Sequence, residues 1–233
     1  MARARSGANL IDDALERADV QEATDRHPRS AVLRHVNQGR AELYDLLVDA
    51  YGRSYFRSPA PWVITTEAGT TVYTAGFPPT FYRAIGVRVT DSGGRGSMPL
   101  VPSQPMEEPW LLEPDSSGWP THYDLRPDGI AIYPAHQPNL RVTVEWIPAV
   151  TDLADDDATT NADGFNGWEE YVIEFAARRI AKKDGDMDIV ADCDREMTRL
   201  RERIKRMAKN RDAHRPRRVQ DVRGPRMGLG RFR

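Results

Sequence analysis

The stretch that decides the fold is Gly-Trp-Glu-Glu-Tyr-Val-Ile-Glu-Phe-Ala-Ala-Arg-Arg-Ile-Ala-Lys-Lys-Asp-Gly at residues 167–185 of the 233-residue chain. Large apolar side chains recur in it at intervals of three, four and five residues: Trp168, Tyr171, Phe175 and Ile180. This spacing places them close to one face of a helix. We therefore expect a helix over 167–184, ending near Gly185, at the centre of a helical body.

Three further stretches have a helical period, and they lie on both sides of this one. They are residues 8–24, roughly 30–51, and 186 to about 209. Ser30 and Asp186 are the expected N-caps of the second and third of these helices. Gly39, in the second helix, is either a weak point or a site of close contact with another helix.

Between these two pairs of helices the apolar residues alternate in short runs, which is typical of strands. The runs are 62–66, 72–74, 81–90, 122–126, 130–133 and 140–147. Asp128-Gly129 separates two of them and indicates a hairpin, and Gly93-Gly94-Arg95-Gly96 reads as a hairpin tip. The Pro-rich stretch 102–120 is expected to hold one short helix around 106–112.

These patterns predict an α+β fold that is mainly helical. Residues 1–54 and 151–209 form a body of four helices, and an acidic loop opens the second of these segments. Residues 55–150 form an inserted β-rich lobe, and residues 210–233 form an extended basic C-terminal arm.

Charge is distributed unevenly along the chain. Residues 199–233 hold fourteen Lys and Arg against three Asp and Glu, a charge of +11, whereas the whole chain carries −2, which leaves −13 on residues 1–198. An arm of this composition cannot bury enough apolar surface to fold alone. We expect it to be disordered until it meets a nucleic-acid backbone or an acidic protein surface; a solvated terminus is the simpler alternative.

Composition excludes several classes of protein. The apolar share of 39% is low for this length, as in proteins that gain stability from neighbours in an assembly. The single cysteine, Cys193, allows no disulfide framework, and we expect it to be a half-buried packing residue. No apolar run is long enough to cross a bilayer, and Met1 to Gly7 lack the apolar core of a secretory signal. A soluble protein of a reducing compartment is expected.

Residues typical of catalysis or metal binding are present, but their spacing forms no site. The five histidines stand in no HExxH arrangement, and there is no phosphate-binding glycine motif. The loop beginning at Asp155 fails as a calcium loop, because its sixth position is Thr160 instead of glycine and its twelfth is Asn166 instead of glutamate. We expect no enzyme activity, cofactor or metal.

Three patches carry a resemblance to a known family. They are the helix 32–47, the strand pair 123–134 with the strand ending at Trp146-Ile147-Pro148, and the stretch 167–185. With the order of the elements, they make the chain resemble the head-to-tail adaptor proteins (head-completion or tail accessory factors) of tailed bacteriophages, especially short-tailed ones.

This resemblance implies a dodecameric ring beneath the portal, made of a helical body with a β lobe, and a C-terminal segment that reaches onto the portal. It brings no catalytic residues. A peptidoglycan-degrading activity credited to some short-tailed phage adaptors has no carboxylate pair here to which it could be assigned.

The main hypothesis is therefore a structural virion protein of the phage neck. Its expected partners are further copies of itself, the portal protein, a tail or nozzle protein and the DNA in the channel, with no membrane contact. The residues expected to bind the portal are Arg215, Arg217, Arg218, Val219, Val222, Arg223, Arg226, Met227, Leu229, Arg231 and Phe232. The alternative is a nucleic-acid-binding protein that uses the same Arg-rich arm. A hydrolase, which would need a catalytic arrangement of carboxylates or histidines, is the least supported class.

Overall fold

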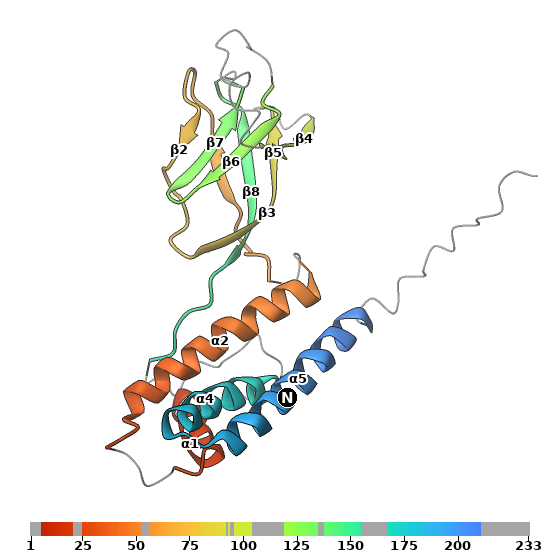
Figure 1. Cartoon of the computed structure of the whole chain (residues 1–233). Coiled ribbons are helices and arrows are strands. Elements are labelled where there is room, and N and C mark those ends of the chain that lie inside the picture. Colours follow the sequence, from red (N-terminus) through yellow and green to blue (C-terminus); the bar gives the residue numbers. More distant parts are fainter. Residues whose placement is uncertain are drawn as a thin grey trace, which may run out of the picture.

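A computed structural model of the chain describes residues 6–20, 25–52, 56–91, 93, 96–103, 119–134, 138–154 and 167–210. Its helices pack together in one body and its strands in a separate lobe above them (Figure 1). The predicted α+β class is confirmed. The arm 210–233, the predicted short helix around 106–112 and most of the acidic loop lie outside the described residues, and the predicted domain boundaries stay predictions.

The helical body contains α1 (Gly7–Arg17), α2 (Arg29–Tyr51), α4 (Glu169–Asp184) and α5 (Met187–Asn210). Every residue of α4 from Tyr171 to Ala177 is buried, so this part of the helix is covered on all sides. Its four large apolar residues, Trp168, Tyr171, Phe175 and Ile180, are all buried. The helix predicted over 167–184 is confirmed, and α4 stands at the centre of the body.

Gly39 lets α2 approach α4 closely. A β-carbon at this position would lie 3.0 Å from Cδ1 of Phe175, which leaves little room for a larger residue. On the other side of the same ring, the guanidinium of Arg179 lies 5.2 Å from its centroid. Of the two predictions for Gly39, the prediction of a close contact with another helix is confirmed.

Two predicted helix ends are wrong. The first helix, expected over 8–24, ends at Arg17, because Asp19 adopts a left-handed backbone (φ 57°) and the amide of Val20 donates back to the carbonyl of Leu15. The second helix begins at Arg29, so Ser30 lies inside it. Pro28 holds the cap position and its carbonyl accepts the first amide bonds of the helix.

The predicted N-cap of the last helix, Asp186, is confirmed. Asp186 precedes α5, and its Oδ1 accepts the backbone amides of Asp188 at 3.2 Å and Ile189 at 3.1 Å. These bonds satisfy two amides that have no partner within the helix. Gly185 adopts a left-handed backbone (φ 82°) and ends α4, as expected from the sequence.

The lobe consists of two four-stranded sheets that enclose a second hydrophobic core. The strands are β1 (Trp62–Thr65), β2 (Val72–Tyr73), β3 (Phe81–Thr90), β4 (Ser97–Pro99), β5 (Val101–Pro102), β6 (His122–Arg126), β7 (Gly129–Tyr133) and β8 (Arg141–Pro148). Their orders are β1-β8-β3-β4 and β2-β7-β6-β5. All six predicted strands are present.

Strands β4 and β5 were not predicted. They have three and two residues, and each ends in a proline, so no alternating pattern can be read from them. β4 pairs with β3 in one sheet and β5 pairs with β6 in the other. The chain passes from one sheet to the other at Leu100, whose side chain is buried in the lobe core.

The predicted hairpin at Asp128-Gly129 is confirmed, with one difference. Arg126 pairs with Gly129 across a turn formed by Pro127 and Asp128, so the glycine is the first residue of β7. A β-carbon there would lie 2.2 Å from the carbonyl oxygen of Tyr73. Glycine is therefore required by the close approach of β2.

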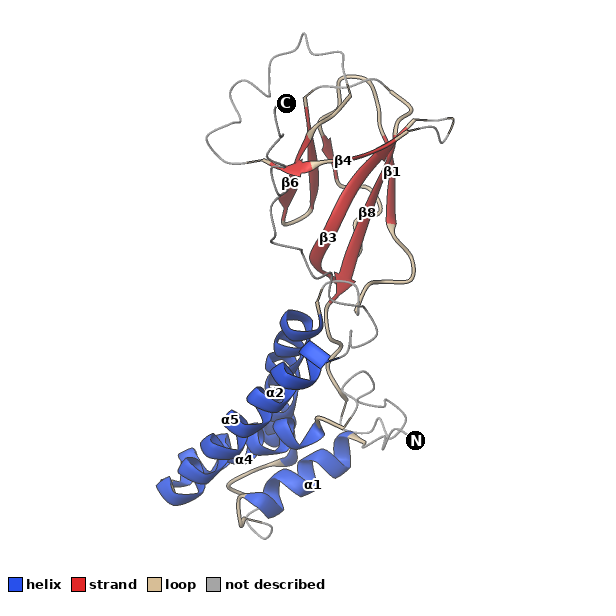
Figure 2. Cartoon of the chain, turned by 90° about the vertical axis from the view of Figure 1, so that its right-hand side faces the viewer, coloured by secondary structure: helices blue, strands red, loops and turns tan. Residues whose placement is uncertain are grey.

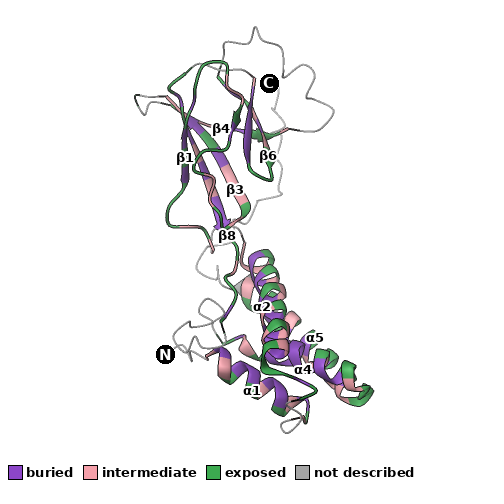
Figure 3. Cartoon of the chain, turned by 90° about the vertical axis from the view of Figure 1, so that its left-hand side faces the viewer, coloured by how far each residue is buried: buried purple, intermediate pink, exposed green. Residues whose placement is uncertain are grey.

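One end of the lobe is attached to α2 (Figure 2). From β3, the hydroxyl of Tyr82 donates to Asp45 at 2.6 Å, and Arg83 pairs with Asp49 at 3.1 Å. From the end of β8, the carbonyl of Pro148 accepts the hydroxyl of Tyr44 at 2.6 Å. Ile147, also from β8, is buried in the core of the helical body. Colouring by burial shows the purple inner faces of body and lobe as two groups (Figure 3).

Phe175→Ala should destabilise the body strongly, because Phe175 is only 5% exposed and fills the α2–α4 contact. We expect the free energy of unfolding to fall by about 3–5 kcal/mol, measured by chemical denaturation. Thr198→Ala, at an exposed position on α5, is the control and should change it by less than about 0.5 kcal/mol. A Phe175→Ala protein as stable as the parent would contradict the central position of α4.

The β3–β4 hairpin tip should tolerate added residues, because loop tips bury little surface. Inserting four Gly/Ser residues after Gly93 should leave the thermal unfolding midpoint nearly unchanged. The same insertion between Asp128 and Gly129 is the matched comparison, because Gly129 is buried against β2 and the insertion should unfold the lobe. Equal effects of the two insertions would refute this assignment of the tip.

Candidate assembly surfaces

The eleven residues expected to bind a portal lie between 215 and 232, outside the described residues. What the structure describes is the helix that precedes them, α5, which ends at Asn210. The candidate site is therefore built from α5, from the polar contacts that hold it and from the hollows beside it.

Helix α5 is divided by charge. From Asp186 to Asp194 it holds four aspartates and no Lys or Arg, whereas from Arg195 to Lys209 it holds seven Lys and Arg and two Glu. Acidic residues near the start and basic residues near the end of a helix both interact favourably with the helix dipole. The sequence thus stabilises α5 while it concentrates positive charge where the arm begins.

The apolar side of α5 reaches the core as far as Ile204. Its buried residues are Val190, Cys193, Met197, Leu200 and Ile204. Beyond Ile204 the exposure changes: Lys205 and Arg206 are exposed, and Met207 is 50% exposed. The last turns of α5 therefore project past the core and present charge and an apolar side chain to the surroundings.

A three-residue cluster fixes the basic half of α5 to the body. The hydroxyl of Tyr171 donates to Oε1 of Glu42 at 2.6 Å, and Arg201 donates to that hydroxyl at 3.0 Å and to the same carboxylate at 2.5 Å. Burial, followed by the bond to Glu42, raises the pKa of Tyr171. The cluster joins α2, α4 and α5, so the direction in which α5 leaves the body is set by three helices. Its members are far apart in sequence, and no local pattern indicates them.

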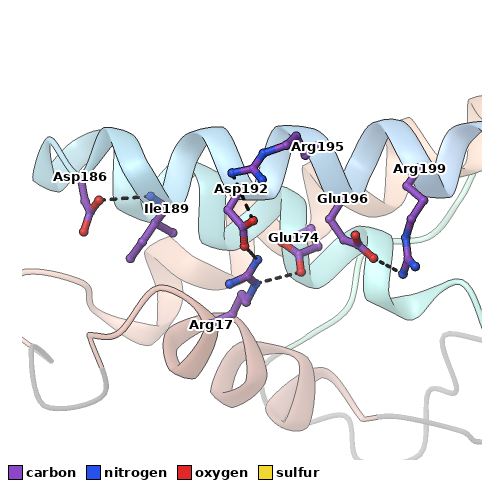
Figure 4. A network of polar contacts seen from close by, with 8 residues as sticks. All are labelled: Arg17, Glu174, Asp186, Ile189, Asp192, Arg195, Glu196 and Arg199. Carbon is purple, nitrogen blue, oxygen red and sulfur yellow. Dashed lines mark hydrogen bonds and ion pairs between the residues drawn. The ribbon is translucent and has the colours of Figure 1, made fainter.

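A second cluster ties α1 to α5 across α4 (Figure 4). Arg17 donates to Glu174 at 2.9 Å and to Asp192 at 2.5 Å. The pKa of Arg17 is raised, first by the bond to Asp192 and then by that to Glu174. The pKa of the Asp192 carboxyl is lowered by the same contact. Because two carboxylates face one guanidinium, the positive charge of Arg17 is fully compensated.

Cys193 lies beside this cluster and is completely buried, so the prediction of a half-buried thiol is wrong. Burial, followed by a hydrogen bond with Glu174, raises the pKa of the thiol to about 12. The thiol therefore stays protonated at neutral pH. Such a residue packs as a small apolar side chain, because the thiolate is the reactive form.

A groove of about 720 Å³ lies on the surface of the lobe. Its walls come from β3, from the β6–β7 hairpin and from the chain just after β5, with Phe77, Phe81, Tyr82, Tyr123 and Leu125 as its large apolar residues. Tyr82 is 42% and Leu125 is 38% exposed. A smaller hollow of about 410 Å³ lies between α2 and the end of α5, lined by Leu46, Asp49, Ala50 and Lys205.

The histidines of the described residues take part in packing and ion pairs. His27 is 4% exposed and lies 2.7 Å from Asp184, which also pairs with Arg26. Across the described ranges, no three His, Cys, Asp or Glu side chains are grouped so that they could hold a metal ion. Among the helices of those ranges, none has the length and apolar character needed to cross a membrane.

The contact between Arg17 and Asp192 should make stability depend on pH in one direction. The pKa of Asp192 is lowered in the folded protein, so its contribution is present above the ordinary carboxyl pKa of about 4 and is lost as the pH falls through the lower folded value. Asp192→Asn should therefore lower the denaturation midpoint at pH 7 and have a much smaller effect below pH 3.

Glu202→Gln, which removes an exposed carboxylate on the same helix, is the control. It should change the midpoint little at either pH. If Asp192→Asn destabilised the protein equally at both pH values, the ion pair with Arg17 would not be the cause.

Comparison with known proteins agrees with the architecture described above. A protein-family model described as SU10 adaptor protein matches residues 6–220, which include both the helical body and the lobe. No curated protein matches the sequence. Because the match extends over most of the chain, the protein belongs to the SU10 adaptor family and is a structural adaptor of a bacteriophage.

Proposed function

We propose that this adaptor is the subunit of a ring in the neck of the virion, where it joins the portal vertex to the tail and helps to retain packaged DNA. The ring has twelve copies, by resemblance to head-to-tail adaptors. The observation that carries the proposal is the way α5 is held: its apolar side is packed into the body as far as Ile204, and its last turns, with Lys205 and Arg206 exposed, lead into the basic arm.

Support for docking through the arm comes from electrostatics and from entropy. Residues 1–198 carry −13, so the body does not attract an acidic partner, whereas the arm does. A segment that orders only on binding loses conformational entropy, which its contacts must offset. The Glu42–Tyr171–Arg201 cluster reduces this loss by fixing the direction of the helix that carries the arm.

The contacts of the arm should combine charge with apolar anchors. Arginine pairs alone are screened at physiological salt, so we assign the residence time on the portal to Val219, Val222, Met227, Leu229 and Phe232. Met207, half exposed at the end of α5, extends this apolar series back to the body. The β lobe, with its exposed groove, is assigned to the contact with a tail or nozzle protein.

The second candidate is nucleic-acid binding through the same arm, and the +11 charge of residues 199–233 favours it. Phe232 is the only aromatic residue in that stretch, so base stacking has little support. DNA passing through the channel would be contacted through its phosphates alone.

Deleting residues 210–233 should leave a folded body that no longer docks stably on portal rings. Co-sedimentation of full-length and truncated protein with purified portal rings measures this, and the thermal unfolding midpoint of the truncated protein is the control for folding. Undiminished docking of the truncated protein would refute the role of the arm.

The anchors and the charges can be separated by point variants. Leu229→Ala with Phe232→Ala should weaken portal docking more than Arg226→Gln with Arg231→Gln. If the arm serves DNA, the arginine variants should have the larger effect, and that effect should shrink as salt is raised. Running both pairs with portal rings and with duplex DNA, each at two salt concentrations, distinguishes the two functions.

A further inference from the structure

Four cations gather on one side of the helical body, where α2 and α4 lie together. They are Arg34 on α2 and Arg179, Lys182 and Lys183 on α4, and all four are exposed. Three of them lie near His35, whose pKa is lowered by burial and, in addition, by the charges of Arg179, Arg34 and Lys183. We call this group the basic patch.

The basic patch has no counter-charge within the described part of the chain. Arg179 lies over the ring of Phe175, and Lys183 donates to the backbone carbonyl of Arg26 at 2.6 Å. No carboxylate of the described residues forms an ion pair with any of the four. In the same body, Arg17, Arg178 and Arg201 all have such partners.

Like charges that are close together repel each other, so the patch opposes folding of the isolated subunit. Its position is also unusual, because residues 1–198 carry an excess of thirteen negative charges that could have been placed beside it. Like charges grouped without an opposite charge are expected at functional sites, where a binding partner supplies the opposite charge.

A second surface of the body has the opposite charge and a hollow shape. Asp13 and Glu16 of α1 and Ile173 of α4 line a groove of about 400 Å³, with Arg17 at one end. Arg17 is neutralised by Glu174 and Asp192, so the groove presents the exposed carboxylate of Glu16 without a compensating charge from Arg17. We call it the acidic groove; its floor, Ile173, is apolar.

The two surfaces lie on different sides of α4. Ile173, in the groove, and Lys182, in the patch, are nine residues apart, which is two and a half turns of an α-helix at about 3.6 residues per turn. The exposed Glu170, one turn before Ile173, stands in the same relation to Arg179. One rigid helix thus contributes residues to both surfaces, in different directions around its axis.

We propose that the basic patch of one copy docks onto the acidic groove of the next copy, as the lateral contact of the ring. This rests on the ring assembly proposed above. A ring needs two different, complementary surfaces on each subunit, and surfaces of opposite charge both attract each other and fix the register. The patch and the groove meet these requirements on the element that forms the centre of the body.

The partner that fits best is a second copy of the chain. A DNA backbone approaching the patch would also face a body of strongly negative charge, which repels phosphate. A second copy supplies carboxylates and an apolar floor together, so that the stems of Lys182 and Lys183 can pack on Ile173 while their charges reach Glu16 and Glu170.

The test uses two double variants of the full chain. In the first, Arg179→Glu and Lys183→Glu reverse the patch; in the second, Glu16→Lys reverses the charge of the groove and Glu170→Lys that of the exposed carboxylate one turn from Ile173. Each alone places like charges at every lateral contact, so the fraction of protein in rings, measured by mass photometry alone and on portal rings, should fall at least about tenfold. Mixed in equal amounts, the two variants can alternate around the ring, and assembly should return.

Arg88→Glu with Arg141→Glu changes the charge by the same amount at exposed positions of the lobe and should leave assembly intact. The inference is overturned if this control disrupts rings as strongly as the patch variant, if the single variants assemble like the parent, or if the mixture fails to assemble although both variants fold. It is also overturned if the patch variant forms normal rings but loses binding to duplex DNA. A parent protein that forms no ring, alone or with portal, would refute the proposed function instead.

Discussion

The placement of the lobe on the body depends on three side chains of α2 that bind the backbone of the segment returning from the lobe. Asn37 pairs with both backbone groups of Leu153, accepting from its amide at 2.9 Å and donating to its carbonyl at 3.1 Å. Arg40 donates to the carbonyl of Thr151 at 2.9 Å, and Tyr44 donates to that of Pro148. At intervals of three and four residues, the three share one face of the helix. These hydrogen bonds hold an irregular backbone segment against α2.

Arg40 is the most demanding of the three, because it is a cation that is only 4% exposed. Burial lowers its pKa, and the nearby Asp152 partly opposes this change. A buried charge is tolerated where hydrogen bonds and an opposite charge replace water. Arg40 therefore favours the one arrangement in which the return segment lies along α2. Tyr82 and Arg83 of the lobe contact Asp45 and Asp49 further along the same helix. Helix α2 is therefore the element of the body to which the lobe is attached.

Features that depend on residues close together in the sequence could be predicted from it, whereas features that depend on residues far apart in the chain could not. Helix α4 and strands β3 and β8 were readable because their apolar periods depend only on neighbours in the chain. The end of α1 was not, because the left-handed turn at Asp19 leaves no mark in the hydrophobic pattern. Nor was the cluster of Glu42, Tyr171 and Arg201, which needs three helices to be in place. The candidate site divides in the same way: the charge of the arm is visible in the composition, whereas the patch around His35 arises only when α2 and α4 lie side by side.

Ion pairs around α5 also bear on the proposed docking of the basic arm. Where the structure describes α5, several of its basic residues already have local partners: Arg199 pairs with Glu196, Arg201 with Glu42, and Arg203 lies over the ring of Trp168. Two carboxylates that face α5, Glu196 and Glu42, are thus occupied. Asp45 and Asp49 are likewise engaged by Tyr82 and Arg83 of the lobe. An arm that folded back would have to displace these contacts, at a loss that a screened surface attraction does not offset. Local neutralisation of the body around α5 therefore supports the proposal that the arm docks on another protein.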